Sequence, residues 1–407
     1  MSVTAAKRNE WFAIHFDNKL IHFCVVPEIG GRVMDLSLGD KQFFYSNHRH
    51  YGRSLAFYPA KSDLMSAPNY GGSKVWLGPQ GWSSDHEWPG PPDPVLDLGA
   101  YAWEVSFGSA TGRVQLSSPH DDYTGVTMCR QIAVNSGSST VQVLHSMRNT
   151  SMRPVRWSIW QVTQIESAYG LEIFAPAKEF RQVLGDQKYK SVQFNAGERS
   201  LRVKYDDRVA KLAINVEDGW IASFHRDRGI VLAETFRTVP RVDYPDGAQV
   251  ALWMNGTGTF TIHGDQVDMS GEPSADPFVE TEIMSPLTQL EPGETYDFRT
   301  TWSLAALRAD QVISVNHCGV IGERLTICHD HSHISGSFGV FWEGCLQLLA
   351  FNRASQIVRT VDLDQVNPLQ AVYIDSDISL PPETARCSLV LSRDGSRIGV
   401  LDHVSIC

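Results

Sequence analysis

Strand signals follow one another along nearly the whole chain, and this feature restricts its fold more than any other. Segments rich in β-branched and aromatic residues are separated by Asp-Gly, Asn-Gly and Pro-Gly turns. No capped helical pattern of about 12 residues or more interrupts them, and short helices are predicted only near residues 175–180 and 305–310. The sequence therefore predicts an all-β chain built from packed sheets.

Two long alternating segments follow each other in the middle of the chain. Residues 141–148 (VQVLHSMR) and 155–165 (VRWSIWQVTQI) flank the polar turn 149–154. Two such segments joined by a short polar turn are typical of a β-hairpin. We therefore predict that these two strands pair with each other.

The spacing of the strand signals changes after residue 310. The candidates become shorter and closer together, and roughly eight of them follow, as in an immunoglobulin-sized sandwich. We therefore predict a large β-sandwich domain over residues 1–307 and a small β-sandwich domain over residues 308–407.

The charge balance argues against polyanionic partners. The chain has 46 acidic and 35 basic residues, a formal net charge of −11, and no run of Lys and Arg. A nucleic-acid-binding face would need clustered basic residues, so neither nucleic acid nor a membrane surface is predicted as a partner.

The cysteines and the N-terminus favour a cytoplasmic location. The seven cysteines include no Cys-x-x-Cys pair, which is typical of reduced thiols rather than of a disulfide framework. The first residues contain no apolar leader, and no apolar run is long enough to span a membrane.

Residues 59–100 differ from the rest in texture. They are rich in Gly, Pro and Trp and alternate little, and they include Trp76, Trp82 and Trp88. Long irregular segments inside compact domains usually have a function, and three indoles are too apolar to be left in water. This segment is therefore predicted to be ordered and to contribute to a site.

Three segments together resemble the galactose mutarotase-like superfamily, of the aldose 1-epimerase type. They are PEIGGRVMDLSLGDKQFFYSN (27–47), NYGGSKVWLGPQ (69–80) and FVETEIMSPLTQLEPGETYDFRTTWSL (278–304). The third is the most specific, and the resemblance covers roughly residues 10–305. The GGSKVW pattern looks closer still to an uncharacterised bacterial branch of that superfamily.

The resemblance implies a β-supersandwich, a sugar ligand, and a general-base glutamate that matches Glu282. It also marks two departures, because Trp160 and Tyr70 stand where the family carries histidines. An epimerase of this type needs no cofactor, and none is predicted. The expected partner is a small sugar or oligosaccharide.

Glu280 and Glu282 are two residues apart on one predicted strand, so their side chains share a face. If that face lines a concave sheet, the carboxylates lie close together and their pKa values separate, as in acid–base pairs. The alternative is a charged strand face in contact with solvent.

A general base needs an acid partner, and Lys74 and His86 are the candidates. Lys74 follows a Gly-Gly turn, where the backbone can approach a ligand, and the ordinary pKa of histidine lies near neutrality. His145 is a further candidate, although it equally fits a core histidine. The residues predicted to contact the sugar are Arg53, Tyr70, Trp76, Gln80, Trp82, Trp88, His145 and Trp160.

Three kinds of function remain open at this point. The first is an epimerase with Glu282 as base. The second is another enzyme on the same sheet, either a lyase with Tyr70, His86 or Lys74 as base or a glycosidase that pairs Glu282 with Asp85 or Glu87. The third is a sugar-binding module without catalysis.

A run of ligand-type side chains, Cys-His-Asp-His-Ser-His, spans residues 328–333. Three imidazoles on one strand face can hold zinc. However, the run precedes Ser-Gly-Ser-Phe-Gly, which is typical of a loop, so a polar surface loop is predicted and no metal site.

Overall fold

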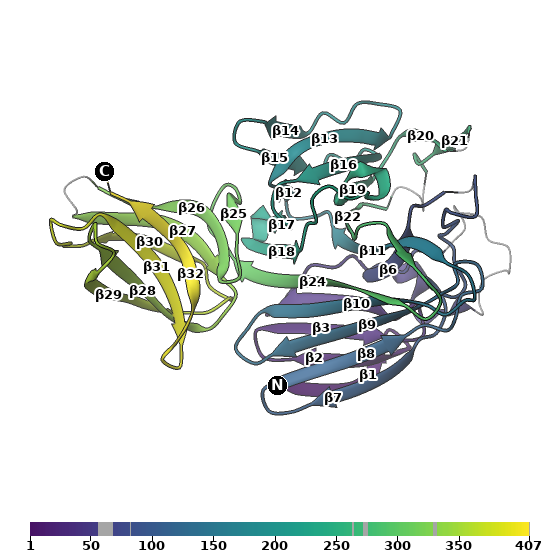
Figure 1. Cartoon of the computed structure of the whole chain (residues 1–407), viewed down its shortest axis with the longest axis horizontal. Coiled ribbons are helices and arrows are strands. Elements are labelled where there is room, and N and C mark those ends of the chain that lie inside the picture. The colour runs from purple at the N-terminus through teal and green to yellow at the C-terminus, as the bar shows by residue number, and fades with distance from the viewer. Residues whose placement is uncertain (56–67, 82, 263, 272–275, 329–331, 407) are drawn as a thin grey trace.

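A computed structural model describes residues 1–55, 68–81, 83–262, 264–271, 276–328 and 332–406 (Figure 1). Strands dominate these residues. Short 3-10 helices occur at η1 (His48–His50), η3 (Arg226–Arg228) and η4 (Pro245–Gly247). In this part of the chain, no helix is long and apolar enough to cross a membrane.

The first large sheet has twelve strands among the described residues. Its main path runs β1-β2-β3-β4-β6-β11-β22-β19-β16-β13, with β5 beside β4 and β23 beside β11. The bounds are β1 (Ser2–Arg8), β2 (Trp11–Asp17), β3 (Ile21–Val26), β4 (Arg32–Leu38), β5 (Lys41–Gln42), β6 (Ser73–Gly78), β11 (Val155–Glu166), β13 (Ala177–Leu184), β16 (Ala210–Val216), β19 (Val250–Asn255), β22 (Phe278–Met284) and β23 (Thr288–Leu290).

The second large sheet has ten described strands in the order β14-β15-β12-β17-β18-β24-β10-β9-β8-β7. The bounds are β7 (Ala102–Phe107), β8 (Thr111–Ser117), β9 (Val126–Asn135), β10 (Thr140–Asn149), β12 (Leu171–Ala175), β14 (Val192–Asn195), β15 (Ser200–Lys204), β17 (Trp220–His225), β18 (Ile230–Phe236) and β24 (Thr295–Ala306).

The main core lies between these two sheets. Strand β9 alternates buried and half-buried residues along its length, as expected for a strand with one face in the core. Strand β11 is buried on both faces along most of its length. One face of β11 packs in the main core. The other face carries Trp160 and Gln164, which are also buried.

The predicted hairpin between residues 141–148 and 155–165 is wrong. Strand β10 pairs with β9 and β24, whereas β11 pairs with β6, β22 and β23. The turn between them therefore carries the chain from one sheet to the other. Asn149 fixes this crossing, since its side-chain amide donates to the carbonyls of Arg153 and Leu290.

Both predicted short helices are also absent from the described structure at those positions. Residues 175–180 fall at the end of β12 and in β13, and residues 305–310 fall at the end of β24 and in the segment after it. Pairing with β16 and β18 supplies the backbone hydrogen bonds that a helix would otherwise make.

The C-terminal part contains two further sheets of four described strands each, β25-β26-β27-β30 and β29-β28-β31-β32. They enclose an apolar cluster of their own. The bounds are β25 (Ser314–Val315), β26 (Gly319–Ile327), β27 (His333–Val340), β28 (Gly344–Phe351), β29 (Ile357–Val366), β30 (Val372–Asp377), β31 (Arg386–Arg393) and β32 (Ser396–Ser405). The predicted fold class, an all-β supersandwich followed by a small β-sandwich, is confirmed.

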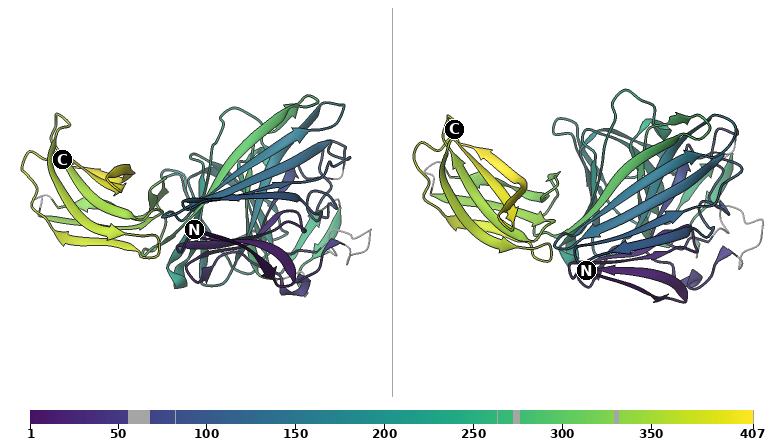
Figure 2. Two further views of the ribbon diagram at one scale, coloured as in Figure 1. Left: turned by 90° about the horizontal axis from the view of Figure 1, so that it is seen from below. Right: turned by 60° about the horizontal axis from the view of Figure 1, so that its bottom comes forward.

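The C-terminal sheets adjoin the large sandwich at the end of β24, as both views of Figure 2 show. A separate apolar cluster fills this junction and takes residues from both sides, among them Phe224, Val231, Leu307 and Phe341. The exact position of a domain boundary at residue 307 stays a prediction.

Candidate functional site

The outer face of the twelve-stranded sheet carries a cavity of about 240 Å³. Central strands supply its floor through alternate residues, because every second side chain of a strand points to the same face. The floor residues are Lys74 and Trp76 from β6, Trp160 and Gln164 from β11, Phe278, Glu280 and Glu282 from β22, Trp253 and Asn255 from β19, and Lys211 from β16.

Glu280 forms a buried ion pair with Lys74. The Lys74 ammonium lies 3.0 Å from Oε1 of Glu280, and the Gln164 amide donates to the same oxygen at 2.7 Å. The ammonium also lies 4.2 Å from the ring centroid of Trp76. The prediction that Glu280 and Glu282 share a face is confirmed, and that face is a cavity floor instead of an open surface.

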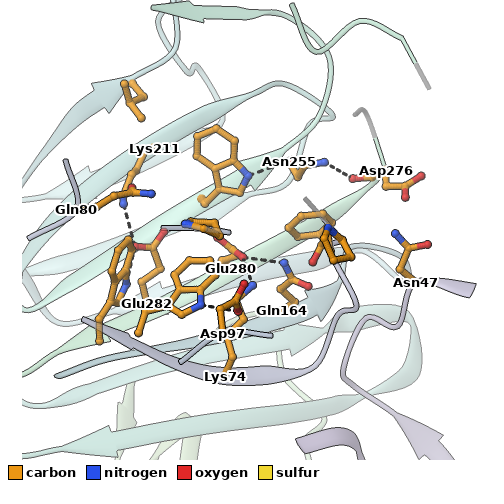
Figure 3. A pocket seen from close by; sticks show the side chains of 18 of the residues that line it. Asn47, Lys74, Gln80, Asp97, Gln164, Lys211, Asn255, Asp276, Glu280 and Glu282 are labelled. Carbon is orange, nitrogen blue, oxygen red and sulfur yellow. Dashed lines mark hydrogen bonds and ion pairs between the residues drawn. The ribbon is translucent and has the colours of Figure 1, made fainter. Parts of the chain in front are cut away.

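Glu282 forms the matching pair with Lys211. The Lys211 ammonium lies 3.0 Å from Oε2 of Glu282, which also accepts a 3.0 Å hydrogen bond from the Trp160 indole. Lys211 lies 4.6 Å from the ring centroid of Trp160. Since β6 and β16 lie on opposite sides of β22, the two lysines approach the carboxylates from opposite sides (Figure 3).

Burial and neighbouring charges shift the pKa values of these groups. Burial raises the pKa of Glu282 to about 7; Lys211 opposes this increase and Glu280 adds to it. Burial lowers the pKa of Lys74 against the opposing effect of Glu280. Burial acts in the same direction on Lys211, but the neighbouring carboxylates, Glu282 first and then Asp246 and Glu280, outweigh it, so the pKa of Lys211 is raised. The pKa values of the Glu282 carboxyl and of the Lys74 ammonium are therefore both shifted toward neutral pH.

Three indoles meet at one end of the cavity. The ring centroids of Trp76 and Trp160 are 5.2 Å apart, and Trp88 packs behind both, at 5.4 and 6.4 Å. Trp88 is fully buried and outside the described lining, and its indole donates to Asp93 at 2.7 Å. Trp76 and Trp160 thus offer ring surface to a ligand, while Trp88 holds them in place.

Asp97 lines the same end and links the floor to the preceding loop. It accepts a 2.7 Å hydrogen bond from the Trp76 indole and is ion-paired with Arg32, which also donates to the carbonyl of Gly71. These contacts fix the Trp76 ring. At the other end, Asp276 accepts from Tyr45 at 2.9 Å.

The Gly71-Gly72 turn places Lys74 but does not approach the cavity. Both glycines have positive φ, and a Cβ at either position would lie 2.4 Å from a carbonyl oxygen, of Tyr45 or of Val33. The close approach predicted for this turn therefore concerns neighbouring backbone and not a ligand.

The structure brings six of the predicted residues to the cavity: Lys74, Trp76, Gln80, Trp160, Glu280 and Glu282. Tyr70 is buried against Trp11 and lies outside the described lining. Arg53 is exposed. Trp82 lies outside the described residues.

The structure does not bring His86 and His145 to the cavity, because each has another environment. The His86 side chain is 83% exposed on a loop, 3.7 Å from Asp85. His145 is fully buried between the sheets and lies 3.0 Å from the side-chain oxygen of Gln161, and burial lowers its pKa to about 3. It is the core histidine that the sequence left open. Asp85 and Glu87 also lie outside the lining.

Lys211 and Gln164 line the cavity but were not predicted from the sequence. Lys211 is the one charged residue of the mostly apolar strand AKLAINV, whereas Gln164 is one of several polar residues in WQVTQIE and does not stand out there. A lysine in a buried strand needs a counter-charge. The position of Lys211 in an apolar strand could therefore have indicated a buried ion pair. Its partner could not be identified because the order of strands β22, β19 and β16 is not written in the sequence.

No group of three or more His, Cys, Asp or Glu residues with metal-binding geometry occurs among the described residues. The run at 328–333 lies partly outside them, since residues 329–331 are not described. His333 itself lies 2.9 Å from Asp375 and 3.1 Å from Asp377 on the surface.

The model of a protein family described as a domain of unknown function (DUF4380) matches residues 12–305. This range contains every floor residue of the cavity. No curated protein matches the sequence.

Several solved structures are similar to this chain. Galactose mutarotase-like proteins from Clostridium acetobutylicum and Lactobacillus casei give TM-scores of 0.47 and 0.46 at 10% and 11% identity, over 75% and 72% of this chain and 98% and 99% of theirs. A TPR-domain containing protein from Parabacteroides distasonis gives a TM-score of 0.49 at 12% identity over 75% of this chain. Only 49% of that protein is covered, so the match spans about half of its length. The predicted resemblance is thus found among solved structures, and at these scores it gives no argument about a reaction.

Proposed function

The chain belongs to the DUF4380 family, and we propose from its cavity that it binds a neutral sugar and interconverts the anomers of that sugar. The observation that carries the proposal is the cavity floor. Two carboxylates, each paired with a lysine, lie there beside the indoles of Trp76 and Trp160. Aromatic rings suit the C–H faces of a pyranose, and the charged groups suit its hydroxyls.

The charges of the lining favour a neutral ligand over an acidic one. The described lining residues include three basic side chains, Arg32, Lys74 and Lys211, against four carboxylates. Each of these cations already has a carboxylate partner. A uronic acid would add a further negative charge with no unpaired cation among the described lining residues to receive it. This supports an epimerase over a uronate lyase.

A glycosidase is less well supported for a geometric reason. The carboxylates predicted to assist Glu282, Asp85 and Glu87, lie outside the described lining. The carboxylate that does lie near Glu282 is Glu280, on the same strand, and it already binds Lys74. An acid–base pair of Glu282 and Lys74 therefore fits the cavity better than a pair of acids.

In the proposed reaction, Glu282 takes the proton of the anomeric hydroxyl as the bond between the anomeric carbon and the ring oxygen breaks. The ring oxygen takes a proton from the Lys74 ammonium, and an open-chain aldehyde results. Closure on the other face of the aldehyde returns both protons to their donors. The lowered pKa of Lys74 makes it a stronger acid than an ordinary lysine, and the raised pKa of Glu282 makes it a stronger base than an ordinary glutamate.

The test is the decay of optical rotation of freshly dissolved α-anomers of the common aldohexoses, with and without protein. We expect acceleration for at least one sugar. The Glu282→Gln variant should lose about 100-fold or more, because glutamine keeps the volume but cannot take the proton. The Glu280→Gln variant should lose about 10-fold, because Glu280 positions the acid and is not itself the base.

Three outcomes would contradict the proposal. Sugar binding without acceleration indicates a binding module. Absorbance of an unsaturated uronate from a polyuronate indicates a lyase. A Glu282→Gln variant as active as the native protein excludes Glu282 as the base.

A further inference from the structure

One wall of the cavity differs in character from its charged floor. Four apolar side chains line it, Leu184, Phe260, Ile262 and Met269, and they pack with Trp253 at the edge of the floor. They belong to a small apolar cluster that is separate from the main core. The rings of Trp253 and Phe260 meet edge to face at 5.4 Å. The cavity is therefore amphiphilic, with ion pairs on one side and hydrocarbon on the other.

A hairpin of β20 (Thr259–Ile262) and β21 (Asp265–Asp268) supplies the centre of this wall. Within the described residues it pairs with no other strand. A lone two-stranded hairpin is only marginally stable in water, so other contacts must hold it. The apolar cluster is one, and the 2.6 Å hydrogen bond from Thr259 to Asp186 is another. Phe260 and Ile262 are two residues apart on β20, and both line the cavity.

Proton transfer at Glu282 makes no use of this wall. A free hexose carries hydroxyls around its ring and would leave the hydrocarbon of Ile262 and Leu184 facing water or sugar hydroxyls. Binding sites place apolar side chains where a ligand presents apolar surface. The ligand that covers both sides of the cavity therefore has a polar and an apolar part.

We propose, on the premise of the sugar-binding function above, that the natural ligand is a sugar bearing an aryl or acyl group, and that the wall of Leu184, Phe260 and Ile262 binds that group. The group is attached to a hydroxyl other than the anomeric one, because anomer interconversion needs a free anomeric hydroxyl. The sugar ring then lies over Trp76 and Trp160, and the apolar group lies under the β20–β21 hairpin.

The first test needs no sugar. Fluorine NMR of 4-fluorobenzyl alcohol should show binding to the full chain that weakens about fivefold in Ile262→Ala, where part of the wall is removed. Val267→Ala is the matched control, since Val267 packs in the same cluster and is equally half-buried but does not line the cavity. If Ile262→Ala fails to fold, Leu184→Ala on β13 carries the same test. No binding to the native chain, or equal weakening in Val267→Ala, overturns the inference.

The second test separates this inference from the proposed function. Calorimetry compares 6-O-benzyl with 6-O-methyl derivatives of glucose and galactose, and the benzyl member of a pair should bind about tenfold more tightly. Equal affinities overturn the inference and leave the sugar-binding proposal intact. Binding of the fluorinated alcohol without binding of any sugar derivative overturns the sugar-binding proposal and shows that the wall receives an apolar ligand of another class.

Discussion

Lys211 controls the charge of the carboxylate that the proposed reaction uses. Its ammonium lies 3.0 Å from Glu282, and this attraction opposes the burial that raises the pKa of Glu282. Without Lys211 the carboxylate would keep its burial and its repulsion by Glu280 but lose its main counter-charge. The residue therefore positions and tunes the base without itself transferring a proton.

We predict that Lys211→Met shifts the acidic limb of the pH profile of kcat/KM upward by about one unit or more. The proposed base acts deprotonated, so activity rises with pH through the pKa of Glu282, which is about 7 in the native protein. Raising that pKa moves the rise to higher pH while the activity at high pH is largely kept. An unchanged profile in Lys211→Met would exclude this role.

The control is Lys178→Met, because Lys178 forms an exposed pair with Glu217 away from the cavity floor. It should leave the profile unchanged. The double variant Lys211→Met/Glu282→Gln removes both charges of the buried pair. It should be more stable than Glu282→Gln alone, which leaves the Lys211 ammonium buried without its partner, and it should remain inactive.

At the scale of elements, one carboxylate behind the cavity joins both large sheets. Glu234 on β18 of the ten-stranded sheet accepts hydrogen bonds from Thr163, at 3.1 Å, and Gln161, at 3.0 Å, on β11 of the other sheet. It also accepts from Thr281 on β22 and, at 3.1 Å, from the Trp302 indole on β24. Thr281 stands between Glu280 and Glu282, so Glu234 fixes the strand that carries the floor carboxylates.

Burial raises the pKa of Glu234 from its ordinary value of 4.5 to about 7, although the hydrogen bonds oppose the shift. A group whose pKa is raised on folding adds stability below its unfolded pKa and loses that contribution as pH rises through the folded pKa. The free energy of unfolding should therefore fall between about pH 4.5 and pH 7, and Glu282 contributes in the same direction.

We predict that Glu234→Gln flattens this fall, because glutamine does not titrate. The measurement is the melting temperature at intervals from pH 5 to pH 8. The variant should also be less stable at every pH, by roughly 1–3 kcal/mol, because its NH₂ group faces donors where an oxygen accepted. The exposed control Glu198→Gln should follow the native curve. A Glu234→Gln curve parallel to the native one would show that Glu234 does not titrate in this range.

The elements themselves were largely predictable, but their partners were not. The strands at 220–225 and 278–284 could be predicted from their β-branched and aromatic residues and their flanking turns, which are local features of the sequence. The turn at 149–154 has the same polar composition in a hairpin and in a crossing between sheets. Asn149 acts through the carbonyl of Leu290, 141 residues away, and no local pattern encodes that contact.

The candidate site was predictable to the same extent, because the local sequence does not encode which distant strands lie next to each other. Glu280, Glu282, Lys74 and Trp76 were predicted from two segments and a family resemblance. Lys211 required knowledge of which strand lies two places from β22 in the sheet. His86 was misplaced because a polar residue in a tryptophan-rich loop looks the same in the sequence whether it points to a cavity or to solvent.

At the scale of the whole molecule, the junction cluster couples the C-terminal sheets to the large sandwich. Phe341 is buried there with Phe224 and Leu307. Its carbonyl accepts a 2.9 Å backbone hydrogen bond from Ser139, in the turn before β10. Phe338, three residues earlier, is equally buried but belongs to the core of the C-terminal sheets alone. The two phenylalanines therefore report on different parts of the molecule.

We predict that the chain melts in a single calorimetric transition and that Phe341→Ala lowers its temperature modestly. Truncating a buried phenylalanine costs about 3–5 kcal/mol, and in one cooperative unit of 407 residues this corresponds to roughly 4–6 °C. Phe338→Ala should lower the same transition by a similar amount if the junction transmits the loss. The opposite result is two transitions, of which Phe338→Ala lowers the temperature of only the smaller one. That temperature should fall by more than about 4–6 °C, because a unit of about one hundred residues has a smaller unfolding entropy. That result would mean that the junction is too weak to join the sandwiches and that residues 308–407 unfold on their own.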